Sequence, residues 1–436
     1  MPKNIYFSFQ LFINQSSMFI KNRFLFRFIG SFFTLLILPF PLSYIPFLGF
    51  INTWFSNFYQ TIIPWFAKNV LHLEKEITVF TNGSGDTTYD YVLILFFVIL
   101  SLIIATVWTL LDKKKPDLTK LSYWFVVLLR YFLGYNMMSY GWSKVIPMQF
   151  SEPSFYRLLE PVGDMSPMGL VWTFIGFSAG YTIFSGIAEV IGGILVLYRR
   201  TQYLGGLILI AVMGNVMAFN YFYDVPVKLF STELWLMAII IASPKIKQLL
   251  NVLLDLKATV PKITFKPFQN SKRKKLATIG KWVFLLFVIF YPLSETIKSM
   301  SLYGRSAPKP PLYGLYEVTN FKANGEEIVP TLKDTVAWRY ISMEWEGSVQ
   351  FYRPDMTRFG YSSVIDTTTQ KLTWTNFSDS TKVYTMKYTR TTDSTMRFQG
   401  IHKNDTIDCE TKILTKKDFP LMNRGYHWIQ EYPYNR

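Results

Sequence analysis

Cysteine and histidine are almost missing from this chain of 436 residues, which has one cysteine and three histidines. A disulfide, a Cys-x-x-Cys redox pair and a cysteine zinc site each need at least two thiols, so Cys409 alone excludes all of them within the chain. His72, His402 and His427 lie far apart in the sequence, and we therefore predict no metal site. Walker loops, HExxH motifs and recognisable Ser/His/Asp patterns are also missing, which leaves no catalytic motif of these kinds.

Charged residues are scarce as well. They make up 17% of the chain, while 50% of its residues are hydrophobic and 18% are aromatic. An average soluble domain has roughly 25% charged residues. A chain this apolar is not mostly solvated, so the composition favours a membrane protein whose first partner is the lipid bilayer.

The formal net charge of +16 does not indicate a nucleic-acid partner. Residues 1–298 carry 27 Lys/Arg against 14 Asp/Glu, and residues 299–436 carry 18 against 15. The excess lies in short stretches between long apolar runs, as in membrane proteins, and not along one basic face.

Seven apolar stretches are candidates to cross a bilayer, which takes about 20 helical residues. They are Phe24–Phe50, Tyr91–Leu111, Leu121–Val145, Ile183–Tyr198, Tyr203–Tyr223, Leu229–Ala242 and Trp282–Ile297. Pro39, Pro41 and Pro46 predict a kink or break near the end of the first. Residues 51–73 have the pattern of an interfacial amphipathic segment, and residues 168–177 predict a short re-entrant or interfacial helix.

The loops predict the orientation of these spans. Strongly basic stretches occur at the N-terminus, in residues 112–120, at Arg199–Arg200 and in residues 243–281, which contain ten Lys/Arg and one Asp. The alternate connections are acidic or balanced. Because basic loops stay on the cytoplasmic side, we expect a multi-pass protein of a bacterial inner membrane with its N-terminus in the cytoplasm and its C-terminal region outside. No cleavable signal peptide is evident.

The composition changes after Ile297. Residues 306–311 (SAPKPP) predict a stiff linker, and residues 312–436 contain short, evenly spaced β-type runs separated by turn signals. This pattern predicts an up-and-down antiparallel β-barrel in which Cys409 points inward. Residues 313–318 (YGLYEV) resemble the glycine–aromatic start of lipocalin-like barrels. The aromatic stretch 425–436 is expected to pack on the barrel or at the membrane surface.

Several motifs within residues 121–250 occur in a recognisable order. They are Arg130, YGWSK at 140–144, FSGIAEVIGG at 184–193, Arg199 to Thr201, Gly205, residues 213–218 and NYFYDVPVKLFS at 220–231. Together they resemble the DoxX family of small helical-bundle membrane proteins, which implies a four-helix membrane core.

The predicted fold class is therefore a membrane all-α helical bundle of about seven spans with a DoxX-like four-helix core, followed by a C-terminal antiparallel β-barrel. Residues 1–120 would hold the N-terminal spans and the interfacial segment, and residues 121–250 the DoxX-like core. Residues 251–298 would hold a basic cytoplasmic segment and the last span. Residues 312–436 would form the extracytoplasmic barrel.

The resemblance implies a quinone-linked or electron-transfer-associated membrane subunit. A quinone or another hydrophobic small molecule is then the candidate cofactor, and a redox partner subunit is expected because the chain has few thiols or metal ligands of its own. The alternative is a non-enzymatic membrane protein whose barrel binds a lipid, a small hydrophobic ligand or a partner protein. Whether the protein is an enzyme stays open at this point.

Two ionisable residues are predicted to lie at mid-membrane, where a charge is costly and marks a candidate site. Counted from the cytoplasmic ends of their spans, Arg130 and Glu189 both lie about 14–15 Å deep at 1.5 Å per residue. Small residues flank Glu189, which favours close helix packing and a buried ion pair. The pair would either bind a ligand or only fix helix register.

A second polar group is expected at the outer mouth of the bundle. A pocket at mid-membrane would be lined by Tyr140, Trp142, Phe219 and Tyr223, and the outer group consists of Lys144, Asn215, Asn220, Asp224, Lys228 and Glu233. These residues would form either a vestibule above the Arg130–Glu189 pair or ordinary interfacial polar side chains with snorkelling lysines.

Overall fold

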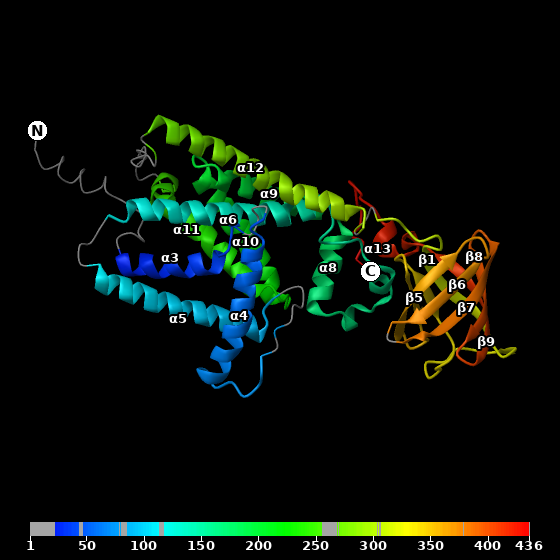
Figure 1. Cartoon of the computed structure of the whole chain (residues 1–436). Helices are drawn as coiled ribbons and strands as arrows, with labels where there is room; N and C mark the ends of the chain where they lie inside the picture. Colours follow the sequence, from blue (N-terminus) through cyan, green and yellow to red (C-terminus); the bar gives the residue numbers. More distant parts are fainter. Residues whose placement is uncertain are drawn as a thin grey trace, which may run out of the picture. The chain divides into compact units, whose positions relative to one another are not determined.

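The computed structural model describes residues 22–435, apart from residues 43–46, 78, 80–84, 113–116, 255–267, 269, 303, 305–306 and 378. Pro46, Ser306 and parts of the basic stretches 112–120 and 243–281 thus lie outside the described residues. The chain forms two compact units (Figure 1). The helical unit comprises Met1–Gln149, Pro167–Val171 and Gly180–Lys298, and the barrel unit comprises Phe150–Ser166, Trp172–Ala179 and Ser299–Arg436.

Long helices make up the helical unit. They are α3 (Arg23–Ile37), α4 (Phe50–Asn69), α5 (Thr88–Leu111), α6 (Thr119–Val145), α9 (Ala179–Leu197), α10 (Gln202–Phe222), α11 (Lys228–Leu253) and α12 (Ser271–Met300). A short helix, α8 (Pro167–Phe177), lies where the sequence predicts one. Within the described residues, five helices are long and apolar enough to cross a membrane: α5, α9, α10, α11 and α12.

The prediction of seven spans is not confirmed. The first predicted stretch is broken, because α3 has 15 residues and ends at Ile37, just before Pro39 and Pro41. At 1.5 Å per residue, α3 is about 22 Å long and falls short of a hydrocarbon core of about 30 Å. Helix α6 has 27 residues, but its basic and polar side chains keep it outside the apolar set.

Most of the predicted segment 51–73 lies in α4, which ends at Asn69. One face of the helix buries Ile63, Phe66 and Ala67 in a cluster with Val92 of α5. On the other face large aromatic side chains are exposed, among them Trp54 and Trp65. The helix therefore has the two faces that an interfacial segment requires.

The barrel unit contains a closed antiparallel β-barrel (Figure 1). Its strands are β1 (Gly314–Ala323), β2 (Glu326–Glu327), β3 (Tyr340–Met343), β4 (Ser348–Tyr352), β5 (Arg358–Asp366), β6 (Lys371–Asn376), β7 (Asp379–Thr392), β8 (Thr395–His402) and β9 (Asp405–Leu414). β1 and β3 to β9 pair in sequence order, and β9 pairs back onto β1, so these eight strands have no free edge. β2 only extends β1 as a short hairpin. The predicted up-and-down meander is confirmed.

Alternation along the strands fills the barrel with side chains. Leu372 and Trp374 of β6 point inward while Lys371 and Thr373 do not, and Trp374 is completely buried. Cys409 is also completely buried in this core, as predicted, and burial raises the pKa of its thiol to about 12. The interior is thus a packed core.

Outside the barrel wall, the segment before α8 packs on the strands. The short helix α7 (Phe155–Leu159) buries Phe155 against Leu315, Tyr340 and Tyr352. The amide of Phe155 donates to the Glu344 carboxylate over 3.0 Å. This part of the barrel unit also includes η2 (Val162–Asp164), η3 (Lys416–Asp418) and α13 (Pro420–Asn423).

The C-terminal aromatic stretch does not pack on the barrel, contrary to one of the two expectations for it. Tyr426, Trp428 and Tyr432 are 76%, 89% and 86% exposed. A place at the membrane surface stays a prediction for these side chains.

Candidate functional site

A buried ion pair joins α6 to α9. Nζ of Lys144 donates to Oε1 of Glu189 over 2.6 Å, and the two side chains are 7% and 2% exposed. The second carboxylate oxygen, Oε2, is buried and has no hydrogen-bond partner among the described residues. Since burying a lone charge is far more costly than burying a pair, Lys144 and Glu189 depend on one another.

Glycines bring the two helices together beside this pair. A Cβ on Gly186 of α9 would lie 2.7 Å from the carbonyl oxygen of Gly141 and 2.7 Å from the amide nitrogen of Val145 on α6. Farther along, a Cβ on Gly193 would lie 2.8 Å from Cβ of Met137. Residue numbers fall on α6 as they rise on α9, so the helices run antiparallel in close contact.

The direction of helical side chains explains why Lys144 reaches Glu189. Every Cα–Cβ bond leans toward the N-terminus of its own helix. Lys144, near the C-terminal end of α6, therefore leans back along α6, and Glu189 leans toward it along the antiparallel α9. The two side chains converge between the backbones that Gly141 and Gly186 bring together.

Tyr140 lies at the edge of the pair. Its ring centroid is 5.7 Å from Nζ of Lys144, and the ring also contacts Phe230 of α11 at 6.3 Å. The tyrosine is 36% exposed, whereas the pair is almost completely buried. It therefore connects the pair with the outer face of the helices and adds a hydroxyl to the group.

Arg130 is not the partner of Glu189, so the predicted Arg130–Glu189 pair is wrong. Nε of Arg130 donates to the carbonyl oxygen of Val196 over 2.8 Å, and Nη2 donates to that of Leu197 over 2.7 Å. These carbonyls end α9, where intrahelical donors run out and positive charge is favourable. Thr201 adds a third bond, from its hydroxyl to the carbonyl oxygen of Leu195. Arg130 thus caps α9.

The register between the helices explains this difference. Gly134 lies against Leu197, which places Arg130 beyond the end of α9, while Gly141 lies against Val190 and so opposite Glu189. The separation of 11 residues between positions 130 and 141 corresponds to about 16 Å along α6. Depth counted from each predicted span end missed this, because the two helices do not end level: Leu197, the last residue of α9, lies against Gly134, 15 residues after the start of α6 at Thr119.

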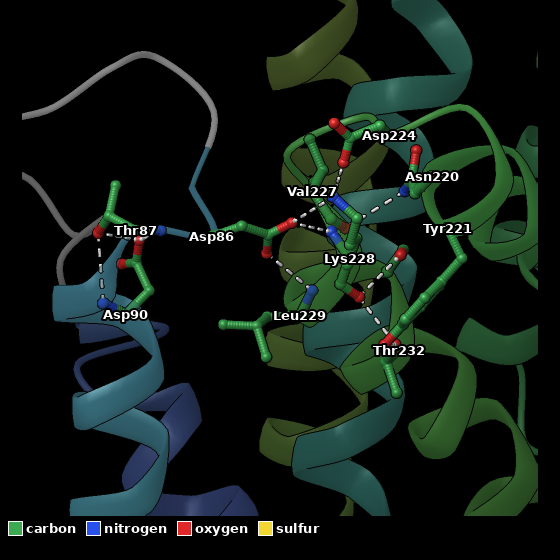
Figure 2. A network of polar contacts seen from close by, with 11 residues as sticks. Asp86, Thr87, Asp90, Asn220, Tyr221, Asp224, Val227, Lys228, Leu229 and Thr232 are labelled. Carbon is green, nitrogen blue, oxygen red and sulfur yellow. Dashed lines mark hydrogen bonds and ion pairs between the residues drawn. The ribbon is translucent and has the colours of Figure 1, made fainter. Parts of the chain in front are cut away.

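Three residues of the outer polar group, Asn220, Asp224 and Lys228, form a separate network around the start of α11 (Figure 2). Nζ of Lys228 donates to Asp224 over 2.8 Å, and the amide of Asn220 donates to the Val227 carbonyl over 3.2 Å. The Asp86 carboxylate, which comes from the segment before α5, accepts from the backbone amides of Lys228 (2.6 Å) and Leu229 (3.0 Å). It therefore caps the N-terminus of α11 from another segment of the chain, and its negative charge interacts favourably with the helix dipole.

Seven of the predicted site residues thus divide into three groups, and Asn215 stands apart from them. Lys144, Glu189 and Tyr140 lie together. Asn220, Asp224 and Lys228 lie in the α11 network, and Arg130 lies at the end of α9. Asn215 is exposed on α10. The structure does not join these groups into one vestibule through any hydrogen bond or ion pair that the described residues make.

Sequence reasoning missed Asp86 and Asp112 as partners of buried groups. Asp112 at the end of α5 pairs with the buried Arg27 of α3, which also donates to the Thr109 hydroxyl over 2.8 Å. Asp86 binds backbone amides, which every residue except proline carries, so its partner has no signature in the sequence. To predict the Arg27–Asp112 pair, one would have had to know that α3 packs on α5.

No group of three or more His, Cys, Asp or Glu side chains that could hold a metal ion occurs among the described residues. No family model matches the chain, and no solved structure matches it significantly. A segment of 112 residues is 34% identical to the uncharacterized protein YwoB of Bacillus subtilis (strain 168), and it covers 26% of this chain and 71% of that protein. Through this segment, the chain belongs to the family of the Bacillus protein YwoB.

Proposed function

We propose that this protein is an integral membrane protein of the DoxX type whose helical unit binds the polar head of a hydrophobic carrier such as a quinone at Lys144, Glu189 and Tyr140. One observation carries the proposal. Glu189 is almost fully buried, uses one carboxylate oxygen for Lys144, and keeps Oε2 without a partner among the described residues. A buried acceptor left in this way is suited to a hydroxyl group from a ligand.

The donors and acceptors of this group fit a quinone head. Lys144 and the Tyr140 hydroxyl can each donate to a carbonyl oxygen, and Glu189 can accept from a hydroxyl. A bound quinone would supply two-electron redox chemistry that side chains lack. The residues would orient the head and hold a proton at Glu189. Electrons would come from a redox partner subunit, as the DoxX resemblance implies.

The surroundings of the pair support access from lipid. Tyr140 beside the pair is partly exposed, and α9 also carries exposed large apolar side chains, Phe184 and Ile187, on the face turned away from Glu189. In a helix that crosses a bilayer, such side chains face the acyl chains, where hydrophobic carriers are dissolved. A carrier could then keep its tail in lipid while its head reaches the pair.

Retention of a carrier tests the proposal. Protein purified in mild detergent should carry quinone that mass spectrometry detects in the lipid extract. Glu189→Gln should retain about tenfold less, since loss of a hydrogen bond to a charged group weakens binding by about 1.5–3 kcal/mol. Tyr140→Phe, which removes only a hydroxyl and leaves the ion pair intact, should retain less as well.

Glu295→Gln is the matched control. Glu295 accepts from Lys298 over 2.8 Å at the end of α12, but the pair is exposed to solvent. The substitution Glu295→Gln makes the same chemical change at an ion pair that no ligand site surrounds, so this variant should retain as much quinone as the wild type. Equal retention in Glu189→Gln, or no quinone in the wild type, would contradict the proposal.

We further propose that the membrane is a bacterial inner membrane, with the N-terminus in the cytoplasm and the barrel outside. The basic stretches support this orientation. A reporter fused after Lys114 should be cytoplasmic, and one fused after Ala307 should report the outer compartment. A cytoplasmic signal from the second fusion would overturn the orientation.

The alternative of a lipid or a small hydrophobic ligand inside the barrel gains no support from the packed interior. Trp374, Phe398 and Phe351 fill it with almost completely buried rings. Binding of a partner protein by the barrel stays a prediction.

A further inference from the structure

His402, the last residue of β8, is enclosed by aromatic rings of the barrel. The rings and their centroid distances are Tyr384 (4.7 Å), Trp338 (5.4 Å), Trp374 (5.9 Å), Tyr361 (6.3 Å) and Phe351 (6.4 Å). Because these rings exclude water from the imidazolium form, burial lowers the pKa of His402 to about 4. The ring is therefore neutral at neutral pH.

Two nitrogen atoms in this corner of the barrel have no hydrogen-bond partner among the described residues. They are Nδ1 of His402 and Nε1 of Trp374, and both are buried. The two rings stack, with an angle of 29° between their planes. Buried polar atoms in native proteins are almost always paired, and of these two residues His402 lines the cavity described next, so its Nδ1 points to a partner from outside the chain.

A cavity of about 70 Å³ opens beside His402, and its polar lining is mainly basic. Arg353 and Lys403 both line it, and neither forms an ion pair within the described part of the chain. Asp405 also lines it, but its carboxylate accepts from the Asn324 side chain over 2.8 Å. The cavity thus presents two cations and one acid already held by an amide, which favours an anion.

The size of the cavity limits the ligand. Its volume of about 70 Å³ has room for a few water molecules or for a small polar group. That is enough for a carboxylate with a short substituent and far too little for a lipid tail. A guanidinium group such as that of Arg353 matches the two oxygens of a carboxylate.

We propose that the cavity beside His402 binds a small carboxylate between Arg353, Lys403 and Nδ1 of His402. The site is separate from the one proposed in the helical unit, and it adds a ligand that the barrel takes up from water. Bound negative charge would favour the imidazolium form of His402, so binding and protonation of His402 are coupled. The charged and titratable groups that face the ring are Arg353, Lys403, Asp405, Tyr361 and Tyr384.

The histidine rings supply the measurement. The full chain has three histidines, so protein labelled with carbon-13 in these rings gives three ring signals, and His402→Gln assigns one of them. At pH 5, a pKa near 4 leaves the His402 ring about one-tenth protonated. Sodium acetate should raise this pKa by about one unit or more, which protonates about half of the rings or more. Sodium chloride at equal ionic strength should leave the signal unchanged.

Variants locate the effect. Arg353→Gln and Lys403→Gln should each raise the acetate concentration needed for half of the shift by about tenfold, while Asp405→Asn should lower it. Lys371→Gln, at the start of β6 and outside the cavity lining, is the control and should behave as the wild type. Near-ultraviolet circular dichroism of the buried tryptophans verifies that each variant is folded.

Three results would overturn the proposal. One is an unchanged His402 signal in acetate, which would assign the unpaired nitrogens to water alone. Another is a shift with phosphate and none with acetate, which would exclude a carboxylate site. The third is a full acetate shift in folded Arg353→Gln and Lys403→Gln.

Discussion

Lys144→Met and Glu189→Met should each lower the free energy of unfolding of the helical unit by about 3–5 kcal/mol, the loss seen when one partner of a buried ion pair is removed from a soluble protein. The physical reason is the charge left behind: each single variant keeps one ionisable group almost fully buried between α6 and α9 without its partner. Thermal unfolding in detergent measures the effect.

The double variant Lys144→Met with Glu189→Met measures the interaction between the two residues apart from the effect of each residue alone. Two methionines of similar volume need no partner, so the double variant should be much more stable than the sum of the two losses predicts. Glu295→Gln, at the exposed pair with Lys298, should leave the unfolding midpoint unchanged. Additive losses in the double variant would show that Lys144 and Glu189 do not interact.

Gly186→Ala should destabilise the helical unit as well, by about 1–3 kcal/mol or more, in the range of overpacked cores. The new Cβ would lie 2.7 Å from backbone atoms of Gly141 and Val145, and backbone atoms of a helix cannot move aside singly. Helices α6 and α9 would have to separate, which would also lengthen the contact between Lys144 and Glu189. Thermal unfolding measures the loss, and retained quinone should fall with it.

Gly280→Ala is the control for this substitution. Gly280 lies within α12, and a Cβ there would have no atom within 4 Å. Alanine is favoured over glycine inside a helix by about 0.5–1 kcal/mol, so Gly280→Ala should stabilise the protein slightly. If Gly186→Ala were as harmless as Gly280→Ala, the close crossing of α6 and α9 would be wrong.

Both predictions depend on the same feature, the close contact of α6 with α9. Small residues at Gly141 and Gly186 let the backbones approach, and the approach excludes lipid and water from the Lys144–Glu189 pair. A pair held in this way has little freedom to reorganise. If a polar head binds there, it meets donors and acceptors that are already oriented.

Local patterns in the sequence were sufficient to predict the five apolar helices and the strands of the barrel. Length and apolar composition placed α5, α9, α10, α11 and α12, because a bilayer-spanning helix must carry about 20 apolar residues wherever it packs. Alternation with period two predicted the strands of the barrel and the burial of Cys409, because successive side chains of a strand point to opposite faces. The proline residues after α3 likewise predicted the break in the first stretch.

The sequence by itself thus determined a set of apolar helices, a closed antiparallel barrel and the burial of Arg130 and Glu189, since each follows from composition or a local period. Only the tertiary structure decided which charges meet. The register of α6 against α9 depends on where the two helices end and on glycine contacts between distant segments. Because of this register, Glu189 pairs with Lys144 and Arg130 caps the end of α9. The same holds for His402, whose unpaired nitrogen follows from rings on several strands that closure of the barrel brings together.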